Sequence, residues 1–419
     1  MTKNPSAIPK IANQHTEEAA FLWLLRNNAI TEAHYDLNHL SDLENRLEAH
    51  LDGLRIAEQT GWELALENLQ QFPESGEMFT AATLAFESDD TEKLQAVYKI
   101  AETNPETERG LISALGWVDS KYLSGKVSGM LDSANPFWRR IGIAACAIHR
   151  VDPGKYLDKA LEDENSALNC RAMKAVGELG KTEKLPLLTK HFSSDNPEQR
   201  FWAAWAATLT GDHLKAPKTL QSFLSTPGKK ALQAAQLIFR VNSLESCQSL
   251  LGGLAKNPES LRLAIQGTGI SGDSRYIPWL IQQMETPAHA RVAGEAFSLI
   301  TGVDLAWNDL ETDQPEGFEA GPTESAEDDN TDLDPDENLP WPEPFSIQQW
   351  WQQHQTDFPV GPRYLMGQVI SADQCTEVLK SGYQRQRMAA ALEKAILQPE
   401  EPLFEIRSKT IIQNKLLDN

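Results

Sequence analysis

The stretch RAMKAVGELGKTEKLPLLTKHFSSDNPEQR, residues 171–200, holds one complete copy of the pattern that decides the fold. It opens with a run rich in Ala and Gly that ends at Gly180, a residue suited to a left-handed helix cap. An amphipathic run follows, with apolar residues at spacings of three and four. An Asn-Pro turn at 196–197 then begins the next copy. The stretch predicts two helices joined by a turn.

The turn proline recurs along the chain at intervals of about 30 residues. Ser166 takes its place in one interval of double length, and the prolines are Pro73, Pro105, Pro136, Pro197, Pro227, Pro258 and Pro287. A basic residue follows soon after each turn from Pro105 onward: Arg109, Arg139, Arg171, Arg200, Lys230, Arg262 and Arg291. Such repetition is typical of an α-solenoid, in which each helix pair buries its apolar face against its neighbours. The alternation typical of strands is missing from the sequence.

The ends of such an array need helical caps, because a terminal repeat would otherwise expose its apolar face. We therefore expect an all-α chain with an N-terminal cap over residues 1–72, the repeat array over 73–305 and a C-terminal cap over 346–419. A disordered acidic linker over 306–345 is expected to separate the array from the C-terminal cap.

Capping boxes predict where some helices of the caps begin, because each box satisfies backbone donors at a helix start. A first helix is expected near residues 16–27. The boxes lie at Ser41 with Glu44, at Ser346 with Gln349 and at Ser371 with Gln374.

The linker stands out by its charge. From Asp304 to Glu343 there are fifteen Asp and Glu residues and not one Lys or Arg. This composition favours a solvated spacer, with a docking segment for a basic partner as the alternative. A frame resembling a calcium loop at Asp332, Asp334, Asp336 and Glu343 has Glu337 where the loop requires Gly, so no calcium site is expected.

Composition limits the classes of partner and compartment. The formal net charge of -22 disfavours nucleic acid and anionic membranes as partners. The first thirty residues carry neither a secretory signal nor a membrane span, so a cytoplasmic location is expected. The four cysteines, Cys146, Cys170, Cys247 and Cys375, lie far apart and are interpreted as reduced core residues.

The repeat motifs resemble the short HEAT-like repeats of the lyase type. Five further stretches resemble an uncharacterised proteobacterial family of HEAT-like proteins whose genes often lie near type VI secretion genes: EEAAFLWLLRNNAI, ENRLEAHLDGLRIA, ARVAGEAFSLITGVDL, LPWPEPFSIQQWWQQHQTDFPVGPRYLMGQ and GYQRQRMAAALEKAI. The resemblance implies a role beside the secretion machinery. It implies no catalytic residues.

Catalytic and metal-binding motifs are missing from the sequence. It contains no phosphate-binding Gly-rich loop, no His-Glu-x-x-His and no Gly-x-Ser-x-Gly. His34, His39 and His50 lack the spacing of a metal site on one helix face and are interpreted as polar-face residues. Glu295, in an apolar helical run, is either a carboxylate with a raised pKa or an acceptor for a neighbouring turn. We expect no cofactor, no metal and no enzymatic activity.

Three pairs of residues are candidates for binding a protein partner. Trp202 with Trp205 and Trp350 with Trp351 are aromatic pairs that either fill the core or meet a partner. Arg363 with Tyr364 lies beside glycines, where a structural turn is the alternative. The predicted function is a protein-interaction scaffold, an adaptor or chaperone accessory to type VI secretion. An enzyme built on lyase-like repeats and a self-assembling structural element are the alternatives.

Overall fold

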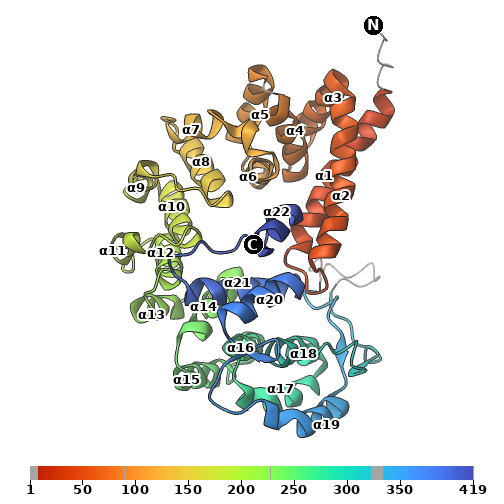
Figure 1. Cartoon of the computed structure of the whole chain (residues 1–419), viewed down its shortest axis with the longest axis vertical. Helices are drawn as coiled ribbons and strands as arrows, with labels where there is room; N and C mark the ends of the chain where they lie inside the picture. The colour runs from red at the N-terminus through yellow and green to blue at the C-terminus, as the bar shows by residue number, and fades with distance from the viewer. Residues whose placement is uncertain (1–7, 89, 227, 322–333, 419) are drawn as a thin grey trace. The chain divides into compact units, whose positions relative to one another are not determined.

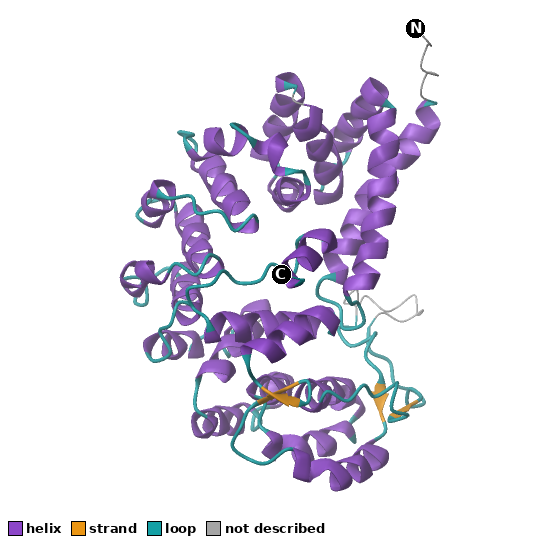
Figure 2. Ribbon diagram, in the orientation of Figure 1, coloured by secondary structure: helices purple, strands orange, loops and turns teal. Residues whose placement is uncertain are grey.

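The computed structural model describes residues 8–88, 90–226, 228–321 and 334–418, which belong to two compact units. Unit 1 contains Met1–Leu179 and Glu405–Asn419, and unit 2 contains Gly180–Phe404. Both units are built of helices, as Figure 2 shows by colour, and the predicted all-α fold is confirmed. No helix within the described ranges is long and apolar enough to cross a membrane.

Unit 1 consists of α-helices joined by short turns and two 3-10 helices (Figure 1). The elements are α1 (Pro9–Ala29), α2 (Leu37–Ile56), α3 (Glu58–Gln71), α4 (Ser75–Ser88), α5 (Thr91–Thr103), η1 (Pro105–Thr107), α6 (Glu108–Trp117), η2 (Ser120–Leu123), α7 (Lys126–Leu131), α8 (Pro136–Ile148), α9 (Lys155–Leu161), α10 (Ser166–Glu178) and α22 (Thr410–Leu417). The first helices of successive repeats, α4, α6, α8 and α10, pack side by side. Aromatic rings of Trp23, Phe79 and Trp117 join α1 to this row.

The turns between repeats are built as the Asn-Pro pattern predicts. Pro136 occupies the first turn of α8, where its missing N–H removes no helical hydrogen bond. The preceding Asn135 caps the helix, because its side chain accepts a hydrogen bond from the backbone N–H of Phe137. α10 begins at Ser166, which confirms that this residue replaces the proline. Pro227, the expected turn of a later repeat, lies outside the described residues.

The second helix of unit 1 begins earlier than its sequence predicts. We expected Ser41 and Glu44 to form a capping box, but α2 begins at Leu37 and Asp36 is its cap. The Asp36 carboxylate accepts a hydrogen bond from the N–H of His39 at 2.8 Å. Ser41 is therefore inside the helix, and Glu44 is buried against Arg26 of α1.

A histidine pair between α1 and α2 makes the stability of unit 1 dependent on pH. The Nδ1 atoms of His15 and His50 lie 3.2 Å apart, and burial together with the charge of His15 lowers the pKa of His50. Because this shift comes from a penalty on the protonated imidazole, unit 1 keeps its full stability above the unfolded pKa of about 6.5 and loses stability as pH falls through the folded pKa. Because His50 is partly exposed, we expect urea unfolding of unit 1 to lose at most about 1 kcal/mol from this pair between neutral pH and about pH 5. The variant His50→Gln should not show this loss of stability at low pH, whereas His34→Gln should show it. If the free energy of unfolding changed equally with pH in both variants, the pH dependence would not come from His50.

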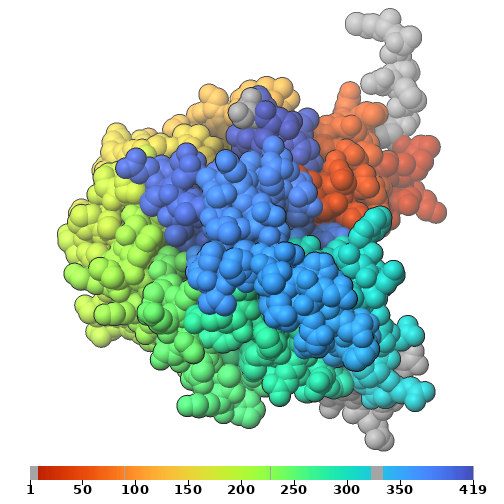
Figure 3. Space-filling model, turned by 60° about the horizontal axis from the view of Figure 1, so that its bottom comes forward, coloured from red at the N-terminus to blue at the C-terminus, as the bar shows by residue number. Residues whose placement is uncertain are grey.

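Unit 2 continues the repeats and adds the C-terminal helices. Its elements are η3 (Thr182–Lys184), α11 (Leu185–Thr189), α12 (Pro197–Leu209), α13 (Lys215–Gln221), α14 (Lys229–Val241), α15 (Leu244–Leu254), α16 (Pro258–Ser271), η4 (Ser274–Tyr276), α17 (Ile277–Met284), α18 (Pro287–Thr301), β1 (Glu311–Thr312), β2 (Trp341–Pro342), α19 (Pro344–His354), η5 (Gln355–Asp357), β3 (Tyr364–Leu365), β4 (Gln368–Val369), α20 (Ala372–Ser381) and α21 (Gln384–Leu397). The row of first helices is α12, α14, α16 and α18. The space-filling view in Figure 3 shows the blue C-terminal residues of this unit lying against its green repeats.

Two antiparallel pairs of very short strands in unit 2 are not predicted by the sequence. β1 pairs with β2 in the register Glu311 to Pro342, and β3 pairs with β4 in the register Tyr364 to Val369. The first pair joins the two described ends of the acidic segment. Residues 311–312 and 341–342 are therefore held in backbone pairing, which corrects the expectation of a loosely held linker for these residues.

Among the C-terminal helices of unit 2, α20 begins at its predicted cap and α19 begins at an unpredicted one. Ser371 caps α20 by accepting a hydrogen bond from the N–H of Gln374 at 3.1 Å, as predicted, but the Gln374 side chain donates to the carbonyl of Leu365 and does not complete the expected box. α19, however, begins at Pro344, and the Glu343 carboxylate caps it in place of Ser346. A carboxylate at the cap also interacts favourably with the positive end of the helix dipole. The proline at the first helical position explains the earlier start.

The hairpin formed by β3 and β4 lies across the ends of α16 and α18. The N–H of Tyr364 donates to the carbonyl of Gly272 at 2.8 Å, and the N–H of Gly367 donates to the carbonyl of Ile300 at 3.0 Å. Helix ends leave carbonyls without intrahelical partners, and the hairpin satisfies them. Gly272 has φ +68°, and an added Cβ would lie 2.5 Å from the Tyr364 carbonyl oxygen, so only glycine fits both the cap and the hairpin.

Candidate functional site

The first candidate tryptophan pair lies on α12 of unit 2. Trp205 is buried, with 9% of its surface exposed, and Trp202 is half-buried. Their rings meet edge to face with centroids 5.7 Å apart, and Trp202 also contacts the ring of Phe201. Trp205 is thus part of the packing between repeats, and only Trp202 contributes a partly exposed ring to the surface.

The second tryptophan pair lies on α19. Trp351 is buried, and Trp350 packs its ring against Phe297 of α18 with centroids 5.6 Å apart. Trp350 also stacks on His354 at 4.2 Å, and both tryptophans contact Phe358. Both rings therefore pack within unit 2 and attach α19 to the last repeat.

Arg363 and Tyr364 have a structural position inside unit 2. The Arg363 guanidinium donates hydrogen bonds to the carbonyls of Arg240, Ile270 and Ser271, at the ends of α14 and α16. It also forms an ion pair with Glu393 of α21 at 2.6 Å. Tyr364 is buried, and its hydroxyl donates to the carbonyl of Pro359 at 3.0 Å. This pair connects the C-terminal helices to the repeats.

Glu295 forms a bidentate ion pair with an arginine of the C-terminal region. Arg385 of α21 donates to both carboxylate oxygens of Glu295, at 3.1 and 3.2 Å. Burial raises the pKa of Glu295, and the charge of Arg385 opposes that shift. Neither the neighbouring turn nor a reacting group is its partner, so Glu295 helps to hold α21 against α18.

Three arginines hold a short part of the acidic segment, at Asp334, Pro335 and Asp336. Arg262 of α16 donates to both oxygens of the Asp336 carboxylate at 2.6 Å each. Arg291 of α18 donates to the Asp334 carboxylate at 2.5 Å and to the carbonyl of Asp336 at 2.9 Å. Arg385 donates to the carbonyl of Pro335 at 3.0 Å. We call this arrangement the arginine clasp. Asp332, the first residue of the calcium-like frame, lies outside the described residues.

A second group of cations lies in unit 1, where the partners are different. The Arg109 guanidinium donates to Asn27 Oδ1 from Nε at 3.2 Å and from Nη2 at 3.0 Å. Nη2 of Arg407 donates to the same oxygen at 3.3 Å. Burial, together with the nearby charge of Arg407 and against that of Glu405, lowers the pKa of Arg109 to about 10. Two guanidiniums thus share one neutral amide oxygen.

More cations surround this pair, and they outnumber the carboxylates. The group, which we call the cationic cluster, contains six cations and three carboxylates: Arg26, Arg109, Arg150, Arg171, Lys174 and Arg407 with Glu44, Glu178 and Glu405. Burial lowers the pKa of Lys174, and the positive charges of Arg171 and Arg407 lower it too. The negative charge of Glu178 opposes this shift. Arg407 is exposed and Arg109 half-buried, so solvent reaches the cluster.

The cysteines do not have the properties of nucleophiles or metal ligands. All four are buried free thiols. Burial raises the pKa of Cys146 and of Cys247 to about 11 and that of Cys375 to about 12. These three thiols are therefore protonated near neutral pH. Among the described residues, no group of three or more His, Cys, Asp and Glu side chains is placed to hold a metal ion.

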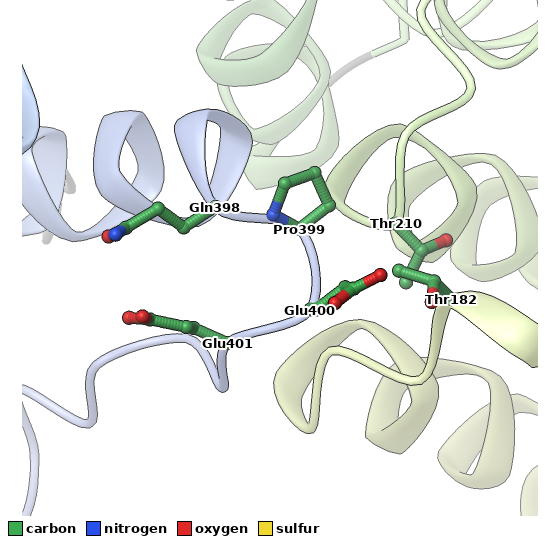
Figure 4. Close-up of a pocket in the computed structure, with 6 residues that line it drawn as sticks. All are labelled: Thr182, Thr210, Gln398, Pro399, Glu400 and Glu401. Carbon is green, nitrogen blue, oxygen red and sulfur yellow. The ribbon is translucent and has the colours of Figure 1, made fainter.

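A pocket of about 430 Å³ lies in unit 2 where the chain leaves α21. Its lining consists of Thr182, Thr210, Gln398, Pro399, Glu400 and Glu401 (Figure 4). The Glu400 side chain points toward the two threonines, while those of Gln398 and Glu401 extend away from them. The lining includes no histidine, cysteine or lysine, so it lacks the usual base that would activate a threonine hydroxyl.

The sequence pointed to only part of the cationic cluster. Arg109 and Arg171 belong to the repeated basic positions, but Asn27 and Arg407 lie in regions with no repeat signal. Arg407 follows the C-terminal helices, and only the folded chain brings it to α1 and α6. Its place could not be found from spacing along the chain.

Comparisons with known proteins identify no relative: no family model, no curated protein and no solved structure is significantly similar to this chain.

Proposed function

We propose that this chain is a non-catalytic scaffold whose helical repeats bind another protein. The observation that carries the proposal is that repeat helices of unit 2 already hold extended pieces of the chain itself. Arg262 and Arg291 bind the carboxylates of Asp336 and Asp334, and the ends of α16 and α18 bind the backbone of the β3–β4 hairpin. Such surfaces suit the recognition of extended polypeptide.

The chemistry of these contacts supports a protein ligand. Arginine–carboxylate pairs with two parallel hydrogen bonds are strong and directional. Helix-end carbonyls offer acceptors to any backbone N–H that lies within reach. The cationic cluster of unit 1 presents similar groups with solvent access. The protonated thiols and the pocket at Thr182 offer no comparable basis for catalysis.

The proposed setting is type VI secretion. It is supported by the resemblance of the chain to HEAT-like proteins encoded near secretion genes, and it makes the chain a cytoplasmic adaptor or chaperone. The proposed partner is an effector or a structural component of the machine. Neither nucleic acid nor a membrane is proposed as a partner, because a net charge of -22 repels phosphate backbones and anionic lipid headgroups.

Affinity capture from the native host tests the proposal. The full chain with an affinity tag is expected to recover one stoichiometric partner encoded among the secretion genes, identified by mass spectrometry. Recovery of general chaperones alone would contradict the scaffold function.

A control bait and a second measurement make the capture specific. An unrelated helical-repeat protein of similar net charge should not recover the same partner. Light scattering of the purified chain should show no growth of mass with concentration. Growth without any partner would instead support the self-assembling structural element.

A further inference from the structure

We infer that the cationic cluster of unit 1 binds an extended acidic segment of the partner protein, with one carboxylate bridging Arg109 and Arg407. The inference rests on the proposed scaffold function and names the chemistry of the segment that the scaffold recognises. It is carried by three observations: a shared neutral acceptor, an excess of positive charge and a matching contact elsewhere in the chain.

The shared acceptor is the amide oxygen of Asn27. Two guanidiniums donate to it, with donor–acceptor distances between 3.0 and 3.3 Å. A carboxylate accepts such donors more strongly than an amide, because the bonds are then charge-assisted. The donors around Asn27 Oδ1 are thus arranged to suit an anionic oxygen, but the oxygen they bind is that of a neutral amide.

The excess of charge is local and has the opposite sign to the whole chain. The cluster holds three more cations than carboxylates, whereas the chain has a net charge of -22. Arg26 and Glu44 neutralise each other at 2.7 Å, and Glu178 already pairs with Arg171 and Lys174. Glu405 pairs with Arg150 at 3.4 Å, and its charge also acts favourably on Arg109 and Arg407. The side-chain acceptor that Arg109 and Arg407 share is the neutral Asn27. An incoming carboxylate would relieve the repulsion between the two guanidiniums that Glu405 leaves.

The matching contact is the arginine clasp of unit 2. Arg262 and Arg291 each lie four residues after a turn proline, as Arg109 does after Pro105. In unit 2 these repeat positions bind Asp336 and Asp334, two residues apart in the chain. Alternate residues of an extended chain lie on the same side. The repeat arginines of unit 2 thus bind carboxylates of an Asp-x-Asp segment, and Arg109, at the same repeat position, would bind one carboxylate of such a segment in the same way.

The variant Asn27→Asp tests the inference without weakening the fold. The new carboxylate would occupy the anion position, pair with Arg109 and Arg407, and raise the melting temperature. A fluorescent peptide with the sequence of residues 334–343, DPDENLPWPE, is expected to bind the full wild-type chain in an anisotropy assay. Binding to Asn27→Asp should be weaker by about ten-fold or more, as expected for the loss of a charge-assisted contact.

Matched controls separate this site from general charge effects. Gln14→Glu adds the same charge to the exposed side of α1 and should leave the affinity within about two-fold, because screening is strong beyond about 10 Å. Arg109→Gln should weaken binding, and Lys121→Gln, at an exposed cation of unit 1, should not. A peptide with Asn and Gln in place of its acidic residues should not bind.

Each remaining outcome has a defined meaning. Equal affinity of the wild type and Asn27→Asp for the peptide would overturn the inference. Competition by inorganic phosphate at concentrations similar to those of the peptide would also overturn it, since the site would then recognise a small oxyanion. If capture from the host recovers a partner equally with wild type and Asn27→Asp, the scaffold function stands and this site is wrong. If the peptide binds but no partner is recovered, the proposed function fails instead.

Discussion

Replacing Glu44 with alanine is expected to lower the free energy of unfolding of unit 1 by about 3–5 kcal/mol, because it leaves the buried Arg26 guanidinium without its carboxylate. Each side chain of this pair has 6% of its surface exposed. Arg26 donates to Glu44 Oε1 from Nε at 3.0 Å and from Nη2 at 2.7 Å. Urea unfolding followed by circular dichroism measures the loss.

The same substitution should loosen the C-terminal segment of unit 1 from α1 and α2. Glu44 Oε2 accepts hydrogen bonds from the N–H and the hydroxyl of Thr410, at 2.8 and 2.7 Å. Arg26 donates to the carbonyls of Arg407 and Ser408 at 3.0 Å each. Amide hydrogen exchange over residues 405–417 should therefore accelerate in Glu44→Ala.

Two further variants test whether the loss of stability comes from the buried Arg26–Glu44 pair. Glu67→Ala removes an exposed carboxylate from α3 and should change stability by no more than about 0.5 kcal/mol. The double variant Arg26→Met/Glu44→Leu should recover most of the loss, because it removes both buried charges. If Glu44→Ala and Glu67→Ala were equally stable, the buried pair would not have the assigned role.

In unit 2, Glu393→Ala is expected to cost about 3–5 kcal/mol, since two guanidiniums depend on this one carboxylate. Glu393 is 2% exposed and pairs with Arg363 at 2.6 Å and with Arg240 at 3.3 Å. Burial lowers the pKa of Arg240 to about 10, although the negative charge of Glu393 opposes this shift. Without Glu393 both arginines would remain beside the helix ends with no compensating charge from α21.

An exposed ion pair on the neighbouring helix supplies the control for Glu393. Glu377 and Lys380 of α20 lie 3.5 Å apart on the surface, and exposed pairs contribute about 0–1 kcal/mol. Urea unfolding should therefore separate Glu393→Ala from Glu377→Ala by more than about 2 kcal/mol. A loss in Glu393→Ala no larger than that in Glu377→Ala would show that α21 is held by other contacts.

The repeat could be predicted from the sequence because its signals are local. An Asn-Pro turn caps the helix that follows it, as at Asn135 and Pro136, whatever the rest of the chain does. Spacing alone indicates that Ser166 replaces a missing proline, and α10 begins there. Turn, cap and amphipathic run depend on residues within one repeat.

The errors at helix starts have an equally local cause. A capping box was expected at Ser41 and at Ser346, but Asp36 and Glu343 cap the two helices instead. In both places a second residue able to cap a helix lies within five positions of the expected serine, and the sequence alone does not show which of the two begins the helix. At α19 the proline at the first helical position decided the start, and at α2 burial of Glu44 against Arg26 removed it from the capping role.

The sequence by itself determined the repeated helix pairs, their turns and the chemistry available at each repeat position, because these follow from residues near one another in the chain. Only the tertiary structure decided the partners of the repeat arginines. Arg262 and Arg291 bind the chain's own acidic segment, whereas Arg109 shares Asn27 with Arg407, a residue almost three hundred positions away. Contacts at such separation depend on where the chain returns after the repeats, and no local pattern encodes that path.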